Sequence, residues 1–147
     1  MNILITGVHG FVGSNLVKAL VPEHTIFGLD IVAPKKEGVK KTFFWEDLPS
    51  TNLGQTQLLD FPKIDAIIHL AGKAHDTRNK STADVYFRVN TGLTQRIFDW
   101  FLTSKSAKKF IFFSTVKSAA DRVEGEFLTE ECVPTPVGPY GERKIKA

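Results

Sequence analysis

Residues 2–13 read NILITGVHGFVG, and this stretch decides the fold. The apolar run at residues 2–5 is typical of a strand that is buried on both faces of a sheet. Three glycines follow with the spacing G-x-x-G-x-x-G, namely Gly7, Gly10 and Gly13. The apolar periodicity of residues 11–21 then predicts a helix. A strand, a glycine turn and a helix in this order predict the first β-α unit of a parallel sheet.

The rest of the chain repeats this alternation of strand and helix. Further strands are expected at residues 25–29, 42–45, 65–70 and 110–113. Helices are expected at residues 53–59, at 83–103 and from about Tyr140, the last after a long polar loop at 116–139. The sequence therefore predicts one α/β domain over residues 1–147, with a doubly wound parallel sheet of the Rossmann type. Ligands of such sheets bind at the carboxyl ends of the strands.

Composition narrows the class of protein. The chain has 147 residues, 42% of them hydrophobic and 24% charged, with 19 basic and 16 acidic residues and a net charge of +3. This charge is too small to indicate a nucleic-acid or membrane partner, and Lys35-Lys36 and Lys40-Lys41 are interpreted as solvated loop charges. A single cysteine, Cys132, and no signal-like or membrane-spanning segment lead us to expect a cytoplasmic protein.

The glycine turn points to a dinucleotide. Its glycines permit a tight turn and a close approach of the backbone to a pyrophosphate, and Phe11 and Val12 begin the helix whose N–H groups face the phosphates. Asp30 ends the second strand, 23 positions after Gly7. A carboxylate there accepts hydrogen bonds from a ribose and repels a 2′-phosphate, so NAD is expected in preference to NADP.

Other strand ends carry further candidates. Glu46-Asp47-Leu48 follows the third strand, within reach of an adenine ring, and small Ala71-Gly72 after the fourth lets a cofactor pass close to the backbone. His69 is interpreted as structural, and His75-Asp76 lacks the further ligands of a metal site. Ser114-Thr115 places two hydroxyls after the fifth strand, where a ligand is expected.

Tyr140 and Lys144 stand four residues apart and share one helix face. A free tyrosine, with a pKa near ~10, is a poor base at neutral pH, but a nearby ammonium lowers that pKa. Such a tyrosine can remove a proton from an alcohol while hydride leaves the same carbon. The pattern Y-x-x-x-K is weak evidence by itself and gains meaning from the features before it.

Together these motifs, and the run LTEECVPTPVGPYGERK, resemble the extended short-chain dehydrogenase/reductases, and more narrowly the NAD-dependent epimerase/dehydratase family that acts on nucleotide-linked sugars. The resemblance spans residues 2–147. It implies catalysis by Thr115 and Tyr140, with Lys144 lowering the tyrosine's pKa. It also implies cofactor contacts from Gly7, Gly10, Phe11, Val12, Gly13, Asp30, Ile31, Asp47, Leu48, Leu70, Ala71, Gly72, Asn90, Ser114, Tyr140 and Lys144.

The resemblance further implies a nucleotide-sugar substrate, and a homodimer through the long helix and the Tyr-Lys helix. This sequence departs from the family at Leu93, where the family has glycine, and at residues 116–120, a loop that contacts substrate. The family continues past the lysine helix with another strand and a substrate-binding region, so we expect a truncated chain that is inactive alone.

Two alternatives stay open at this point. A 4-keto-sugar reductase or another reductase of the same superfamily would use the same residues, although many of these prefer NADP. A non-catalytic dinucleotide-sensing module would share the fold, but such proteins commonly lose the tyrosine or the lysine, and both are present here.

Overall fold

Five strands form one sheet in the order β3-β2-β1-β4-β5. All neighbouring strands run parallel. The strands are β1 (Asn2–Thr6), β2 (Thr25–Asp30), β3 (Val39–Phe44), β4 (Ala66–His69) and β5 (Lys109–Phe112). The chain builds outward from β1 to β3 and then returns to the other side of β1 for β4 and β5. This reversal creates a switch point between β1 and β4, so the predicted doubly wound parallel sheet is confirmed.

The computed structural model describes residues 1–48, 61–72, 91–120, 122–123, 125–136, 141 and 145. Contacts divide the chain into two units: Met1–Ala71 with Arg96–Phe113, and Gly72–Gln95 with Ser114–Ala147. The first unit holds the sheet. Among the described residues, no helix has both the length and the hydropathy needed to cross a membrane.

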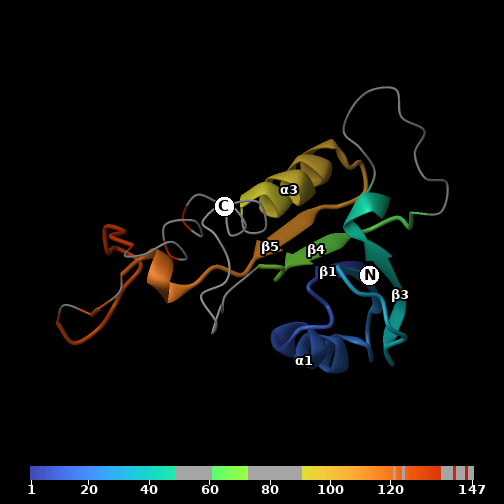
Figure 1. Ribbon diagram of the computed structural model, residues 1–147, viewed down its shortest axis with the longest axis horizontal. Coiled ribbons are helices and arrows are strands. Elements are labelled where there is room, and N and C mark those ends of the chain that lie inside the picture. The colour runs from blue at the N-terminus through green and yellow to red at the C-terminus, as the bar shows by residue number, and fades with distance from the viewer. Residues whose placement is uncertain are drawn as a thin grey trace. The chain divides into compact units, whose positions relative to one another are not determined.

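One face of the sheet is covered by α1 (Phe11–Leu20) (Figure 1). Val17 of the helix is 2% exposed and packs against side chains from three strands. These strand side chains are Ile3, Ile5, Ile26, Ala66 and Ile68. Both this face and the opposite one are apolar, which explains why the strands read as continuous rather than alternating hydrophobic runs.

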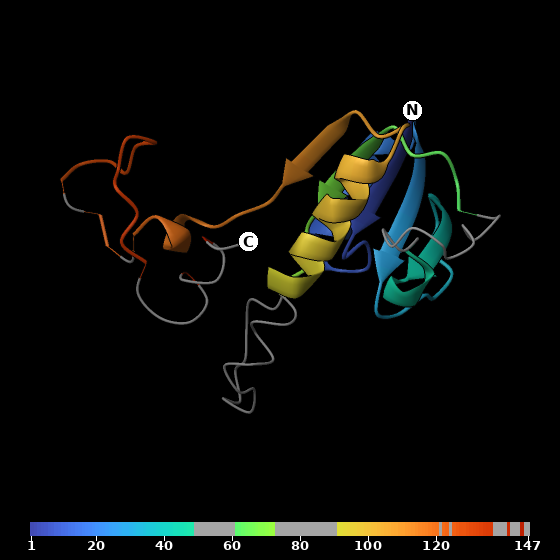
Figure 2. The ribbon, with the colours of Figure 1, turned by 90° about the horizontal axis from the view of Figure 1, so that it is seen from above.

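The opposite face is covered by α3 (Leu93–Thr103), as the view from above shows (Figure 2). Ile97 and Trp100 of α3 are buried, and the ring of Trp100 meets that of Phe61 edge-on at 5.3 Å between centroids. Phe98 makes the same kind of contact with Phe110 of β5, at 5.2 Å. Helices on both faces agree with the predicted doubly wound sheet.

Most predicted elements appear within one or two residues of their expected bounds, but the third strand was placed wrongly. It begins at Val39 rather than at residue 42, and Trp45 belongs to the 3-10 turn η1 (Trp45–Asp47). Lys40 and Lys41 interrupt the apolar pattern at the start of the strand. Charged residues are accommodated there because β3 is an edge strand whose side chains reach solvent. The predicted helix at residues 53–59, the part of the long helix at 83–90 and Tyr140 lie outside the described residues.

Candidate functional site

The glycine turn closes the carboxyl end of β1 against the stretch that follows β4. Gly7 has a φ of +68°, and its N–H donates to the Leu29 carbonyl at 2.9 Å. A Cβ at Gly7 would lie 3.2 Å from the backbone N and Cα of Ala71. The turn therefore depends on glycine for its conformation and also for the contact that it makes.

Gly13 lets the first turn of α1 rest on the glycine turn itself. A Cβ at Gly13 would lie 2.5 Å from the Gly7 carbonyl oxygen and 2.8 Å from the Val8 backbone. Gly10 is the N-cap, and no side chain caps the helix start, where Phe11 and Val12 are exposed. A helix start left open in this way offers N–H groups to an anion. These residues fit a dinucleotide phosphate.

Asp30 ends β2 beside this turn with a fixed carboxylate. Its Oδ2 accepts from the His9 N–H at 3.0 Å, and its Oδ1 accepts from the Ile31 N–H at 2.8 Å. Each oxygen keeps an acceptor lone pair for a further donor. The Ile31 side chain is 77% exposed and is free to cover a ligand. The carboxylate that is predicted to bind the ribose is thus already fixed in place, and both of its oxygens can accept a further hydrogen bond.

Thr6 ties the two neighbouring strand ends together. Its Oγ1 accepts from the N–H groups of Leu70 and Ala71 at 3.1 and 2.9 Å, and it lies 2.6 Å from His69 Nδ1. Since two donors occupy the hydroxyl's lone pairs, its proton goes to Nδ1, which assigns the Nε2–H tautomer to His69. His69 is fully buried and stacks on Phe112, as befits a structural histidine.

The candidates after β3 and β4 differ in exposure. Asp47 caps η1 by accepting from the Phe44 N–H at 2.8 Å. The Leu48 side chain is buried, its N–H donates to the Trp45 carbonyl at 3.4 Å, and its carbonyl accepts from Arg96 at 3.5 Å. Leu70 and Ala71 are half-buried, and Gly72 is exposed. Leu70, Ala71 and Gly72 form the stretch that is predicted to lie beneath the cofactor. Its first two residues are held in place by the N–H groups that donate to the Thr6 hydroxyl.

The second unit contains the hydroxyls that follow β5. Thr115 caps the 3-10 turn η3 (Val116–Ser118), with its Oγ1 3.4 Å from the Lys117 nitrogen that donates to it. The Ser118 hydroxyl donates to the Thr115 carbonyl at 2.6 Å and lies 3.2 Å from the Ser114 hydroxyl. These bonds hold the Ser114-Thr115 pair in a compact turn.

Gly141 packs directly against this turn. A Cβ at Gly141 would collide with the Lys117 carbonyl oxygen and would lie 3.2 Å from Pro136. The Ile145 N–H donates to the Gly141 carbonyl at 3.1 Å, which is an i to i+4 helical bond. The residue that follows Tyr140 in the sequence is thus brought to the turn that begins after Thr115.

Some sequence candidates lie outside the described residues, namely Asn90, Tyr140 and Lys144. The same holds for His75 and Asp76, and the described ranges contain no group of three metal-ligating side chains. Sequence reasoning missed the role of Thr6 and the close packing of Gly141. A hydroxyl at the end of β1, level with His69 on the paired strand, was the available signal for the first.

The topology, the glycine turn and the carboxylate at the end of β2 define a Rossmann-type α/β protein. The model of the NAD dependent epimerase/dehydratase family matches residues 3–147, and the chain belongs to this family. The resemblance drawn from the motifs is thereby confirmed.

Individual relatives are distant. The UDP-glucose 4-epimerase of Streptococcus mutans serotype c is 26% identical, over 99% of this chain and 44% of the relative. That of Vibrio cholerae is 29% identical, over 99% and 44%. The structure of UDP-glucuronic acid 4-epimerase from Bacillus cereus in complex with NAD superimposes with a TM-score of 0.72, at 25% identity, over 99% of this chain and 50% of that one. The chain therefore spans about half the length of the relatives it matches.

Proposed function

We propose that this chain is the NAD-binding portion of an enzyme that acts on a nucleotide-linked sugar. The observation that carries the proposal is the arrangement of Asp30 beside the open start of α1. Two backbone N–H groups fix the Asp30 carboxylate, while the glycine turn leaves the helix start free for a pyrophosphate. The relatives named above supply the substrate class, a sugar attached to a nucleotide.

NAD is the proposed cofactor, in preference to NADP. A fixed carboxylate accepts hydrogen bonds from ribose hydroxyls, whereas a 2′-phosphate in the same place would meet a like charge with no cation bonded to Asp30 among the described residues. NAD held by the glycine turn and Asp30 would supply the acceptor for a hydride from the substrate carbon. The remaining cofactor contacts proposed here are those of Ile31, Asp47, Leu48, Gly72, Asn90 and Ser114.

Thr115, Tyr140 and Lys144 are the proposed catalytic residues. Support comes from Gly141, which lies against the η3 turn that Thr115 caps and so brings the segment after Tyr140 to the segment after β5. Tyr140 would take the proton of a sugar hydroxyl, Thr115 would hold that hydroxyl, and the Lys144 ammonium would favour the phenolate.

The experiment is a calorimetric titration of the purified protein with NAD and with NADP, repeated on Asp30→Asn. We expect saturable NAD binding that is weaker for NADP. A hydrogen bond to a charged group contributes about 1.5–3 kcal/mol, so NAD affinity should fall by about tenfold to a hundredfold in Asp30→Asn.

Glu23→Gln is the matched control, because it removes an exposed carboxylate that lies before the start of β2, whereas Asp30 ends that strand. NAD affinity should be unchanged in this variant. Equal binding of NAD by Asp30→Asn and the unmodified protein would overturn the proposed ribose contact.

We also expect residues 1–147 to bind NAD without converting a substrate, since the matched epimerases are more than twice as long. The measurement is a proton NMR time course of UDP-glucose with the protein and NAD. Appearance of an epimerised sugar would contradict this expectation and would place the whole substrate site within these residues.

A further inference from the structure

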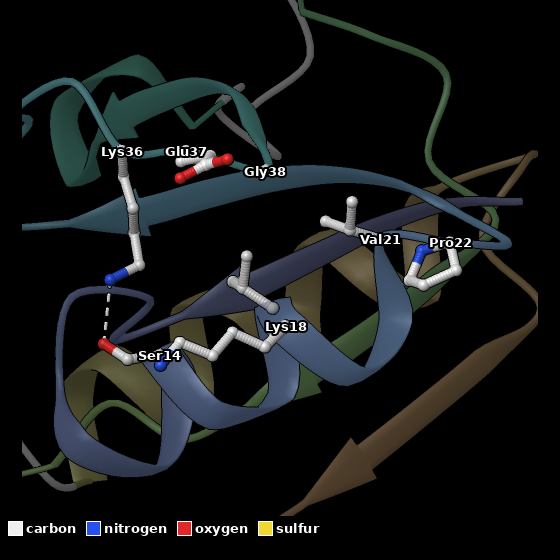
Figure 3. Close-up of a pocket in the computed structure, with 8 residues that line it drawn as sticks. Ser14, Lys18, Val21, Pro22, Lys36, Glu37 and Gly38 are labelled. Atoms are coloured by element: carbon white, nitrogen blue, oxygen red, sulfur yellow. Dashed lines mark hydrogen bonds between the residues drawn. The ribbon is translucent and has the colours of Figure 1, made fainter.

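A groove of about 410 Å³ lies between α1 and the connection from β2 to β3. This volume is within the range of about 300–1,000 Å³ that is usual for small-molecule sites. One wall is apolar and consists of Val17, Val21 and Pro22, and the connection supplies Lys36 and Gly38. Figure 3 shows Val21 and Pro22 toward one end of the groove and the Ser14–Lys36 pair toward the other.

The shape of the groove depends on Gly38. This residue has a φ of +80°, and a Cβ there would lie 2.7 Å from Val21 Cγ2 and 3.0 Å from Val17 Cγ1. Because residue 38 is glycine, the connection between β2 and β3 can pack directly against α1 and form the second wall of the groove. The adjacent turn is closed by the Val39 N–H, which donates to the Lys36 carbonyl at 3.1 Å.

The polar end of the groove is a half-buried ammonium. Lys36 Nζ donates to the Ser14 hydroxyl at 2.8 Å (Figure 3). No carboxylate among the described residues is within bonding distance of Lys36, and an ammonium has three protons to donate. Lys36 therefore retains donors, and a positive charge, for an acceptor that enters the groove.

The charges that line the groove favour a singly charged ligand. Lys18 and Lys36 contribute two positive charges and Glu37 contributes one negative charge, so the lining sums to +1. Glu37 is exposed on the connection, where it would oppose a doubly charged group. Val21 and Pro22 are exposed and offer an apolar surface to a hydrocarbon chain, whereas Val17 is buried beneath them.

We propose that this groove is a second binding site, which takes a monocarboxylate bearing an apolar chain. The carboxylate accepts from Lys36 and Ser14, and the chain lies along Val21 and Pro22. The groove shares no lining residue with the candidate cofactor positions. The site is independent of the function proposed above.

The test is a calorimetric titration of the purified protein with octanoate, with octan-1-ol as the uncharged probe of equal chain length. Octanoate should bind saturably and at least tenfold more tightly than octan-1-ol. Lys36→Met retains an unbranched side chain but removes the charge, and it should weaken octanoate binding at least tenfold. Ser14→Ala should weaken it by a smaller factor.

Lys35→Met is the matched control, since Lys35 is exposed and does not line the groove. Octanoate should bind this variant as it binds the unmodified protein. Thermal unfolding curves and NAD titrations of all three variants should match those of the unmodified protein, which separates this site from the cofactor site. An absence of saturable octanoate binding, or an equal loss in Lys35→Met and Lys36→Met, would overturn the proposal.

Discussion

Gly13 is a residue at which one added carbon is expected to destabilise the fold. In Gly13→Ala the Cβ would lie 2.5 Å from the Gly7 carbonyl oxygen, and both Gly7 and Val8 meet it with backbone atoms that cannot rotate away. Overpacking of this kind costs about 1–3 kcal/mol. We expect the free energy of unfolding to fall by that amount in urea denaturation, and NAD affinity to fall with it.

Gly92→Ala is the matched control. A Cβ at Gly92 would meet nothing within 4 Å, just before α3 begins. Alanine is favoured over glycine in helices by about 1 kcal/mol, so this variant should be as stable as the unmodified protein or more stable. Equal stability of Gly13→Ala and Gly92→Ala would show that the turn can move away from the helix.

The role of an individual residue could be predicted from the sequence where the pattern around it has a single physical cause. The glycine spacing and Asp30 were found because a dinucleotide turn requires them. The packing reason for Gly141 was not found, because it depends on the Lys117 carbonyl, 24 positions earlier in the chain. Contacts between loops leave no periodic signal in a sequence.

Among contacts between elements, the hydrogen bonds of Thr6 join the end of β1 to the end of β4, and a substitution of Thr6 tests how much they contribute to stability. Thr6→Val keeps the shape of the side chain but removes the acceptor for Leu70 and Ala71 and the donor to His69. Each buried group left without a partner costs about 1–3 kcal/mol. We expect Thr6→Val to lower the free energy of unfolding by at least about 2 kcal/mol in urea denaturation, and to weaken NAD binding.

Thr6→Ser retains the hydroxyl and should keep NAD affinity close to that of the unmodified protein, with a modest loss of stability from the missing methyl group. The comparison separates the hydrogen bonds from packing. Equal NAD affinity in Thr6→Val and Thr6→Ser would show that β4 stays against β1 without this hydroxyl.

The elements themselves were predictable to the extent that they are buried. β1, β2 and β4 are covered on both faces and read as apolar runs, so their positions were confirmed. β3 was placed three residues late because Lys40 and Lys41 lie within it. The lysine ammoniums lie 5.8 and 4.6 Å from the ring centroids of Phe27 and Phe43, and the sequence contains no sign of such contacts.

At the level of the whole molecule, α3 presents an apolar face that is suited to a partner. Leu102 is 65% exposed and Phe98 is 39% exposed. Exposed apolar surface of this kind marks interfaces, and a twofold dimer through the helix is the proposed assembly. The protein should elute at twice its mass of 16.4 kDa. Leu102→Asp should elute as the monomer, because the interface would bury an unpaired charge.

Lys105→Asp is the control, since it adds a carboxylate just after α3 at a position that is already polar. It should leave the elution volume unchanged. A monomeric unmodified protein, or a dimer that survives Leu102→Asp, would exclude this helix as the interface.

The doubly wound parallel sheet was the most secure prediction for the whole chain, because alternating strands and helices leave few parallel arrangements. What could not be predicted is the groove beside α1. It arises because Gly38 has a positive φ and rests on Val17 and Val21, which are 21 and 17 positions earlier in the chain.

The hydrogen bond between Thr6 and His69 should also be visible in the ¹⁵N NMR spectrum of the histidine ring. While Thr6 donates to Nδ1, the ring proton of His69 stays on Nε2, so the two ring nitrogens should give well-separated ¹⁵N resonances. If the strand ends separate, Nδ1 loses its donor and the tautomers can exchange, which would bring the two resonances together. The closure of the glycine turn could therefore be followed in solution from a single imidazole, without any added label other than nitrogen-15.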